Sequence, residues 1–413
     1  MKKGSIWRKW DLHVHTPFSI LNNGFGNNWD EYIKQLFTKA INEKISAIGI
    51  TDYFIIDGYK KIKSEYLNNQ QKLSELFTTE QIEIIKTIII FPNIEFRLNK
   101  LVGPNRINFH VLFSDEVCIE DIEENFLHEL DFVYECTPQS TEEKRKLKVK
   151  HLEALGGKLK NQHEKFREKS DLEIGMINAV LDDEQITQIL INKASIFKDK
   201  YFILLPCDED LSKLSWNGQD HHTRKLFIQK TDILIATNSN TIKWALGEFN
   251  NTKEDYIKEF KSLKPCIGGS DSHNFSELFT KNSEKMTWIK ADVSFEGLRQ
   301  IIFEPSQRIQ LSKEEPYKKE SKNVIEEVKV VSSDKTFTDQ SFFFNDNLNV
   351  IIGGKSSGKS ILLYNIARTL FQDNNEHSLL KVYNPDTKRE EFKYDFSDDF
   401  DFIIKLKSGA TNQ

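Results

Sequence analysis

Short apolar runs recur through the first three hundred residues, and segments long enough to form helices separate most of them. Apolar runs that stop at turn residues are typical of buried strands. Strands that alternate with helix-length segments favour an α/β fold. The predicted strands of this region are residues 11–16, 48–52, 88–95, 107–113, 202–207 and 266–273.

A second strand-rich pattern begins at residue 324. We predict strands at 324–331, 342–344 and 348–352, followed by a helix at 361–367. Residues 313–323 are charged and contain Pro316, which is typical of a linker. The chain is therefore expected to have a first domain at 1–312, with a helical insertion at about 115–200, and a second domain at 324–413.

The first predicted strand carries two histidines, His13 and His15. Side chains of a strand alternate between its faces, so both imidazoles leave the same side, about 6.5–7 Å apart. That spacing lets both bind one metal ion. Two hydrogen-bonded histidines without a metal are the alternative, and the pair alone does not decide between them.

Further metal-type side chains lie at or near the ends of the other strands. The carboxyl ends of strands in a parallel barrel gather on one face, where such folds build active sites. Core packing does not explain this recurrence, which favours a metal-dependent hydrolase. The residues concerned are Asp52, Glu95, His110, Cys207, Asp271 and His273.

The order His-x-His, Thr-Asp, Glu, His, Cys, Asp-x-His resembles the polymerase and histidinol phosphatase (PHP) superfamily. The resemblance implies a distorted seven-stranded (βα) barrel that hydrolyses phosphoesters with two or three divalent cations. Mixed nitrogen, oxygen and sulfur ligands suit Mn²⁺, Zn²⁺ or Fe²⁺. By this resemblance the first cation is held by His13, His15, Glu95 and Asp271. Glu95 is shared with a second cation held by His110 and Cys207.

The third cation site of that family is incomplete in this chain. Tyr53 stands where the family has a histidine, another ligand position falls near Ile20 and Leu21, and His273 alone remains. Two cations are therefore expected and a third is left open. Asp52 either contributes to that site or orients a metal-binding histidine through a hydrogen bond. His273 is predicted to act as a general acid or to orient the substrate.

Residues 353–360 match the phosphate-binding loop pattern Gly, four residues, Gly-Lys-Ser, between a predicted strand and a predicted helix. Lys359 is expected to reach the β- and γ-phosphates of ATP, and Ser360 to bind Mg²⁺. The backbone of the loop is expected to surround the phosphates. The alternative is a glycine-rich turn. The other loop residues concerned are Gly353, Gly354, Ser356 and Gly358.

Residues 288–292 and 295–305 resemble a subgroup in which a PHP domain is fused to an ATPase of the ABC, SMC and Rad50 type (TrlF-type proteins). Fifty-three residues follow Ser360, and we find neither the acidic strand end nor the second, signature helix of such an ATPase among them. We expect the first lobe of such an ATPase, truncated, with no ATPase activity of its own. A partner chain would supply the missing half, or two copies would associate through these lobes as a homo-oligomer.

Composition is that of an ordinary intracellular protein. The net charge is −6, no run of 18 apolar residues is present, and the start lacks an apolar signal core. The four cysteines show no paired spacing that would indicate disulfides. We expect a cytoplasmic protein that does not bind membranes.

Residues 142–169 carry ten Lys or Arg against five Glu, with Gly156 and Gly157 expected to split the segment into two helices. It is either a solvated helical face or a basic arm that grips a phosphate backbone. Trp216 and residues 220–225 are a second candidate contact, with a surface loop as the alternative.

The resemblance implies a nuclease acting on DNA or RNA, regulated by ATP binding, with a role in phage defence or DNA repair. Two cations sharing Glu95 would lower the pKa of a bound water towards neutrality. The alternatives are a small-molecule or nucleotide phosphatase, and a non-catalytic PHP scaffold on a partner-binding ATPase.

Overall fold

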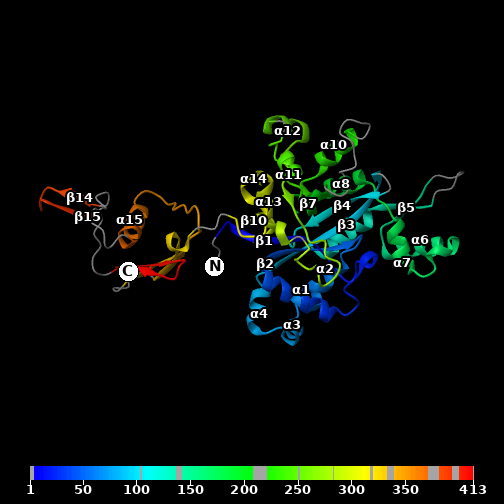
Figure 1. The fold of residues 1–413 in the computed structure, drawn as a ribbon, viewed down its shortest axis with the longest axis horizontal. Coiled ribbons are helices and arrows are strands. Elements are labelled where there is room, and N and C mark those ends of the chain that lie inside the picture. The colour runs from blue at the N-terminus through cyan, green and yellow to red at the C-terminus, as the bar shows by residue number, and fades with distance from the viewer. Residues whose placement is uncertain are drawn as a thin grey trace. The chain divides into compact units, whose positions relative to one another are not determined.

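A computed structural model of the protein (Figure 1) divides by contacts into two units, Trp7–Pro316, and Met1–Ile6 together with Tyr317–Gln413. Each unit is described by itself. The structure describes residues 4–102, 105–135, 142–207, 221–249, 252–281, 283–316, 320–332, 339–370, 381–392 and 400–412.

The larger unit is built on a nine-stranded sheet with the order β11-β10-β1-β2-β3-β4-β7-β8-β9. Beyond β9 the chain returns to β1, where Ser272 forms a parallel bridge with Val14, so the sheet is nearly closed. The predicted α/β class is confirmed. The sheet has nine strands instead of the expected seven because β10 and β11 continue it beside β1. Its strands are β1 (Ile6–His15), β2 (Ile45–Tyr53), β3 (Ile89–Val102), β4 (Asn105–Phe113), β7 (Tyr201–Pro206), β8 (Ile233–Ile235), β9 (Cys266–Ile267), β10 (Met286–Ala291) and β11 (Ile309–Ser312).

Strand β4 departs from the parallel barrel expected from the sequence, because it runs antiparallel to both β3 and β7. Only two residues separate β3 from β4, which is too short for the helical crossover that parallel neighbours need. The pairs β1–β2, β2–β3, β7–β8 and β8–β9 are parallel.

Helices cover both outer sides of this sheet, with α1, α3 and α4 on one side and α10, α11 and α12 on the other (Figure 1). The helices of the larger unit are α1 (Trp29–Glu43), α2 (Asp57–Lys61), α3 (Gln70–Leu76), α4 (Thr79–Ile85), α5 (Ile119–Asn125), α6 (Val149–Gln162), α7 (Asp171–Asn178), α8 (Asp183–Asn192), α9 (Ala194–Phe197), α10 (His221–Lys230), α11 (Ser239–Ala245), α12 (Lys253–Phe260), α13 (Phe295–Phe303) and α14 (Pro305–Arg308).

Local sequence explains α1 well. Asn28 caps its start by accepting a hydrogen bond from the Glu31 amide, and Lys44 ends it in a left-handed conformation with φ 57°. The residues buried along α1 recur at the spacing of one helix face. They are Tyr32, Ile33, Leu36, Phe37 and Ala40.

An apolar cluster fills the inside of the sheet below the candidate site. Phe91 of β3, Leu112 of β4 and Leu298 of α13 belong to it, so α13 packs against the inner strands. Asn93 and Glu95 share the face of Phe91 by two-residue alternation and lie nearer the carboxyl end of β3. The packed interior therefore supports the polar residues above it.

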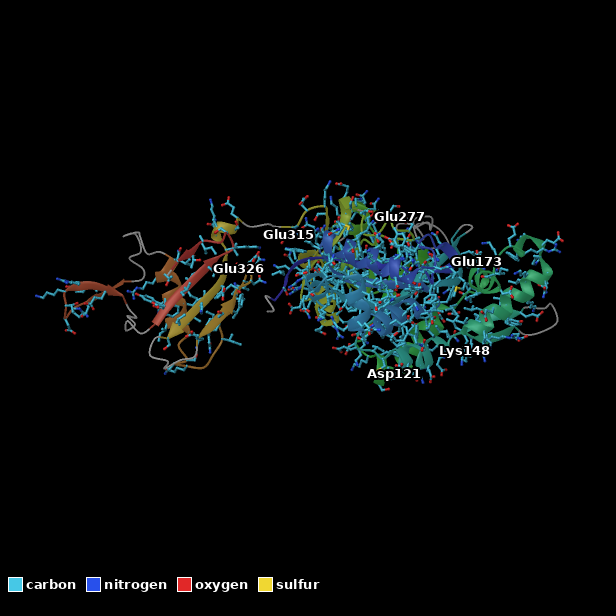
Figure 2. All side chains as sticks on the ribbon, turned by 90° about the horizontal axis from the view of Figure 1, so that it is seen from below. Asp121, Lys148, Glu173, Glu277, Glu315 and Glu326 are labelled. Carbon is cyan, nitrogen blue, oxygen red and sulfur yellow. The ribbon has the colours of Figure 1, made fainter. Side chains whose placement is uncertain are left out.

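The insertion contains helices and a hairpin, β5 (Asp131–Glu135) with β6 (Glu143–Lys146), and is therefore not purely helical. The prediction that Gly156 and Gly157 break a helix is wrong, because α6 runs through both. A Cβ at Gly156 would lie 1.7 Å from the backbone oxygen of Asp171, so this glycine allows α6 to pack closely on α7. Figure 2 shows Lys148 and Glu173 on the part of the molecule formed by α6 and α7.

A buried carboxylate of the insertion is paired with two partly exposed lysines from β3 and α10. Asp183, at the start of α8, is 1% exposed and accepts hydrogen bonds from Lys100 of β3 (2.5 Å) and Lys230 of α10 (2.7 Å). Two cations around one buried carboxylate satisfy it where water cannot.

The smaller unit has a four-stranded sheet with the order β13-β12-β16-β17, and α15 packs on it through Val328, Ile366 and Ile404. Its elements are β12 (Ile325–Ser332), β13 (Gln340–Phe343), α15 (Lys359–Leu370), β14 (Lys381–Asn384), β15 (Arg389–Phe392), β16 (Phe400–Leu406) and β17 (Thr411–Asn412).

The predicted strand at 348–352 does not form. β12 pairs with β13 on one side and β16 on the other, and no described strand borders residues 348–352. Without a neighbouring strand the backbone has no ladder to join. Three alternating apolar side chains are left exposed, Leu348 at 80%, Val350 at 70% and Ile352 at 87%.

Candidate metal centre

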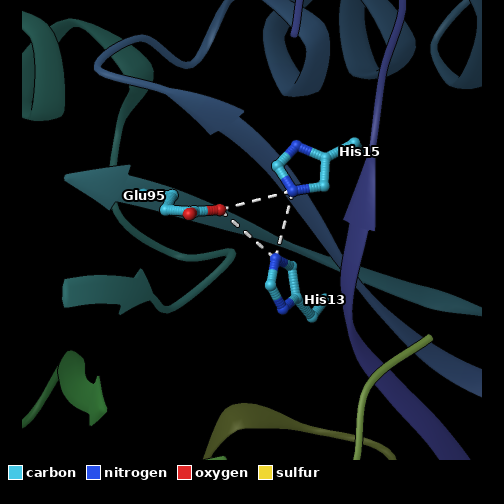
Figure 3. A group of neighbouring side chains, drawn as sticks. All are labelled: His13, His15 and Glu95. Carbon is cyan, nitrogen blue, oxygen red and sulfur yellow. Dashed lines mark hydrogen bonds and ion pairs between the residues drawn. The ribbon is translucent and has the colours of Figure 1, made fainter. Parts of the chain in front are cut away.

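The register of the sheet brings three predicted strand-end residues to one level. Tyr53 of β2 lies opposite Glu95 of β3, and Glu95 lies opposite His110 of β4. Residues directly opposite each other point to the same face. His13 and His15 come from the end of β1, and one carboxylate oxygen of Glu95 faces both imidazoles (Figure 3).

Asp271 and His273 reach the same place through the turn that follows β9. The Asp271 amide donates to the His13 oxygen (2.9 Å), and the His15 amide donates to the Ser272 oxygen (3.2 Å). A Cβ at Gly269 would lie 2.6 Å from the His13 Cβ, so glycine lets this turn pass close to β1. Asp271 itself has a left-handed φ of 46°.

Four of these side chains, His13, His15, Glu95 and Asp271, form what we call the histidine–carboxylate cluster. The two Nε2 atoms are 3.1 Å apart, each lies 3.3 Å from Glu95 Oε2, and each lies 3.4 Å from Asp271 Oδ1. Four ligand atoms at about 2.0–2.1 Å around a tetrahedral metal are separated by about 3.3–3.4 Å. The four separations between a histidine nitrogen and a carboxylate oxygen therefore match the spacing that one cation requires, and the two Nε2 atoms lie slightly closer together.

The electrostatics of the cluster also suit a cation. Burial raises the pKa of Glu95, but His110, His13 and His15 outweigh it and hold that pKa well below the ordinary value. Asp271 follows the same pattern beside His13 and His15, and its pKa is also lowered. Burial lowers the pKa of His15, but contacts with Asp271 and Glu95 raise it to about 9. The two anionic carboxylates thus stabilise positive charge among them.

His110 lies beside the cluster with its Nε2 atom 4.0 Å from Glu95 Oε2. It is fully buried, and neither ring nitrogen has a hydrogen-bond partner among the described residues. Burial lowers its pKa to about 3, so the ring is neutral, which is the form that binds metals. Buried polar atoms without partners are costly. A second cation bound between His110 and Glu95 would satisfy this imidazole.

Cys207 is the predicted ligand that the structure does not bring into a cluster. Among the described residues, no group of three ligand atoms within 4.8 Å of one another includes its thiol. Cys207 is buried in an apolar cluster that also contains Tyr256 and Cys266. Its role as a ligand stays a prediction.

His273 completes a second group of possible ligands with His15 and Asp271. Its Nδ1 lies 3.0 Å from the Asp271 backbone oxygen, which can only accept, so the proton is on Nδ1. Its Nε2 therefore accepts from the Tyr53 hydroxyl at 3.0 Å. Burial lowers the pKa of His273 to about 4, and with both nitrogens engaged its geometry suits orientation better than proton donation.

Asp52 does not face the cluster, and all its described contacts come from hydrogen-bond donors. Oδ1 accepts from Thr16 Oγ1 and from Ser19 Oγ, both at 2.7 Å, and Oδ2 accepts from the Gly58 amide at 3.0 Å. Ser19 Oγ in turn lies 2.8 Å from His15 Nδ1. Because the hydroxyl proton goes to Asp52, the serine oxygen accepts Nδ1–H, which leaves Nε2 as the ring nitrogen that would give up its proton to bind a cation in the cluster.

Sequence reasoning missed several residues around the centre. Asp11 accepts from the amides of His13 (3.2 Å) and Ser270 (3.1 Å) and so joins β1 to the turn after β9. Asn93 donates to the Leu12 oxygen at 3.0 Å. Two-residue alternation from Glu95 could have indicated Asn93, but Ser19 lies in a loop and carries no such signal.

The basic segment 142–169 is largely neutralised by its own neighbourhood, which favours the solvated-face interpretation. Seven of its ten Lys and Arg side chains lie within 4.0 Å of a carboxylate. Trp216 and Asp220 lie outside the described residues. His221–Lys225 form the first turns of α10 and not a loop.

The predicted nucleotide loop precedes α15, which begins at Lys359. The Lys359 ammonium donates to the backbone oxygens of Gly353 (2.9 Å) and Gly354 (2.6 Å). Ser356 and Gly358 have left-handed φ values of 62° and 84°. The ammonium thus lies inside the loop, next to the backbone expected to surround phosphates.

Among known proteins, similarity to this chain was found only at the level of the fold. No protein-family profile and no curated protein matches the chain. A crystal structure of a proposed metal-dependent phosphoesterase from Bifidobacterium adolescentis is similar over 65% of this chain and 88% of its own, at 12% identity and a TM-score of 0.31. At that TM-score the neighbour adds nothing to the functional case, which depends on the geometry of the cluster.

In the part of the chain that the structure describes, no helix combines the length and apolar character needed to cross a membrane.

Proposed function

We propose that the larger unit is a metal-dependent phosphoesterase. The observation that carries this proposal is that the buried His13 and His15 nitrogens lie 3.1 Å apart and that each lies 3.3–3.4 Å from a Glu95 oxygen and an Asp271 oxygen. When bound, divalent cations would polarise a phosphoryl oxygen and lower the pKa of a water molecule.

The residues of the chain have distinct parts in this proposal. His13, His15, Glu95 and Asp271 would hold the first cation, and Glu95 and His110, with Cys207 as the predicted third ligand, would hold the second. The chain from Asp52 through Ser19 keeps the proton of His15 on Nδ1. The Tyr53 hydroxyl holds His273 in place beside Asp271.

The proposed substrate class is nucleic acid, DNA or RNA, and its support is the resemblance to barrels fused with DNA-handling ATPases. A role in phage defence or DNA repair depends on the same resemblance. The smaller unit is proposed to bind ATP with Mg²⁺ at residues 353–360, supported by the loop pattern and the start of α15.

The test combines elemental analysis with hydrolysis assays on the full chain. Purified protein is reconstituted with Mn²⁺, Zn²⁺ or Fe²⁺ and assayed on DNA, RNA, nucleotides and p-nitrophenyl phosphate. We expect about two cations per chain and a preference for a nucleic acid. His13→Ala should lose a cation and the activity, and exposed His163→Ala should keep both.

Preference for p-nitrophenyl phosphate or nucleotides would replace the nuclease by a small-molecule phosphatase. A wild-type chain that retains no cation after reconstitution would overturn the proposal and leave the scaffold alternative.

A further inference from the structure

Strand β3 places an arginine next to the cluster. Asn93, Glu95 and Arg97 leave the same face because strand side chains alternate. Glu95 belongs to the histidine–carboxylate cluster, so Arg97 starts about 7 Å further along the strand from a cluster residue. An arginine side chain is long enough to cover that spacing.

The guanidinium of Arg97 lies 5.6 Å from the centre of the Tyr53 ring. That ring is itself part of the site, since it lies 4.9 Å from the His15 ring and its hydroxyl contacts His273 Nε2. A cation over an aromatic face is held there by the ring quadrupole. Tyr53 thus keeps the guanidinium beside the place where phosphate would meet the cations.

Arg97 is half-buried, yet among the described residues it has no carboxylate partner and its guanidinium makes no hydrogen bond. Two other arginines of the same unit are paired with carboxylates, Arg145 with Glu143 (2.9 Å) and Arg308 with Glu304 (2.7 Å). A guanidinium has five N–H donors, and none of the Arg97 nitrogens is among the fully buried atoms without a partner, so its donors are open to solvent and to an anion. The site therefore offers a prepared position for an anion.

We propose that Arg97 is a phosphate-binding residue, which donates its planar pair of N–H groups to oxygens of the phosphoryl group of the substrate. The fork of a guanidinium matches two phosphate oxygens, which an ammonium cannot do. This inference rests on the proposed phosphoesterase function. The competing explanation is that Arg97 only supports the Tyr53 ring.

The test measures binding of inorganic phosphate to the Mn²⁺-loaded full chain by titration calorimetry. Arg97→Gln should weaken phosphate binding about 10- to 100-fold, because a hydrogen-bonded charge contact is lost. Arg97→Lys should give an intermediate loss, since it keeps the charge but not the fork. Arg106→Gln changes an exposed arginine on the neighbouring strand β4 and should bind phosphate as wild type does.

Metal content measured on each sample separates the two explanations. Weaker phosphate binding at unchanged metal content supports the proposal. Wild-type affinity in Arg97→Gln, or a loss of phosphate binding that parallels a loss of metal, overturns it. If Arg97→Gln does not fold, an Arg97→Lys affinity equal to wild type overturns it as well. A wild type that binds phosphate through Arg97 but hydrolyses no ester would remove the proposed function and leave Arg97 as a phosphate-binding residue without a substrate.

Discussion

Ser19 offers a sharp test of how the centre is oriented. Its hydroxyl lies between Asp52 Oδ1 (2.7 Å) and His15 Nδ1 (2.8 Å), and the residue is fully buried. Ser19→Ala removes the acceptor that holds the His15 proton on Nδ1. Loss of such an orienting partner typically weakens metal binding about 10- to 100-fold, or about 1.4–2.7 kcal/mol.

Thr16→Val is the matched control for Ser19→Ala. Thr16 also donates to Asp52 Oδ1 at 2.7 Å, but it has no contact with His15 among the described hydrogen bonds. Each variant removes one hydrogen bond from the same buried carboxylate and one contact with the backbone, Ser19 Oγ to the Thr51 oxygen (3.2 Å) or the Phe18 amide to Thr16 Oγ1 (3.1 Å). Both should therefore lower the free energy of unfolding by a similar amount, about 1–2 kcal/mol. Only Ser19→Ala should weaken the binding of the metal ion.

The assay is a chelator competition with Mn²⁺ or Zn²⁺, run alongside urea denaturation of the metal-free proteins. We expect Ser19→Ala to bind metal at least 10-fold more weakly than Thr16→Val. Equal metal affinities in the two variants would refute the orienting role of Ser19, because the effect would then pass through Asp52 alone.

Three further predictions concern other parts of the chain. Gly156→Ala should lower the unfolding free energy by about 1–3 kcal/mol through overlap with α7, whereas Gly157→Ala, whose nearest neighbour is a side chain at 3.2 Å, should be neutral or stabilising by denaturant melts. Burial raises the pKa of Asp183, but its two lysine partners outweigh it and lower that pKa. The stability this contributes is complete above the unfolded value of about 3.8 and is lost as the pH falls below it, so wild type should lose more stability than Asp183→Asn between pH 5 and 3. Lys359→Ala should abolish binding of a fluorescent ATP analogue, and exposed Lys355→Ala should not; equal binding by both would contradict the phosphate-loop assignment.

The alternation of side chains along a strand was enough to predict the part of the site that comes from a single strand. The convergence of His13 and His15 follows from two-residue alternation within one strand, and their Nε2 atoms are in fact 3.1 Å apart. The neighbouring position of Glu95 and His110 depends on the antiparallel register of β3 and β4, which periodicity does not reveal. The resemblance to a family supplied these residues without supplying that register.

The errors have a common physical origin in tertiary context. Leu348, Val350 and Ile352 have a strand pattern, but a strand exists only where a neighbour accepts its hydrogen bonds. Gly156 and Gly157 have a helix-breaking composition, but close packing of α7 on α6 outweighs the weak propensity of glycine. In both cases the deciding contact comes from another segment of the chain.

The cluster and the closure of the sheet are one structural feature. Two backbone hydrogen bonds join β1 to residues 271–272, and they are made by the same residues, His13, His15 and Asp271, whose side chains form the cluster. A cation held there would link β1, β3 and the turn after β9. Of its ligands, Glu95 and Asp271 are more than 170 residues apart in the sequence. Because a ligand that binds only the folded state stabilises it by mass action, metal should protect the amides of His15 and Asp271 from hydrogen exchange more than those of α6. Equal protection at both places would mean that the metal does not bind where the sheet closes.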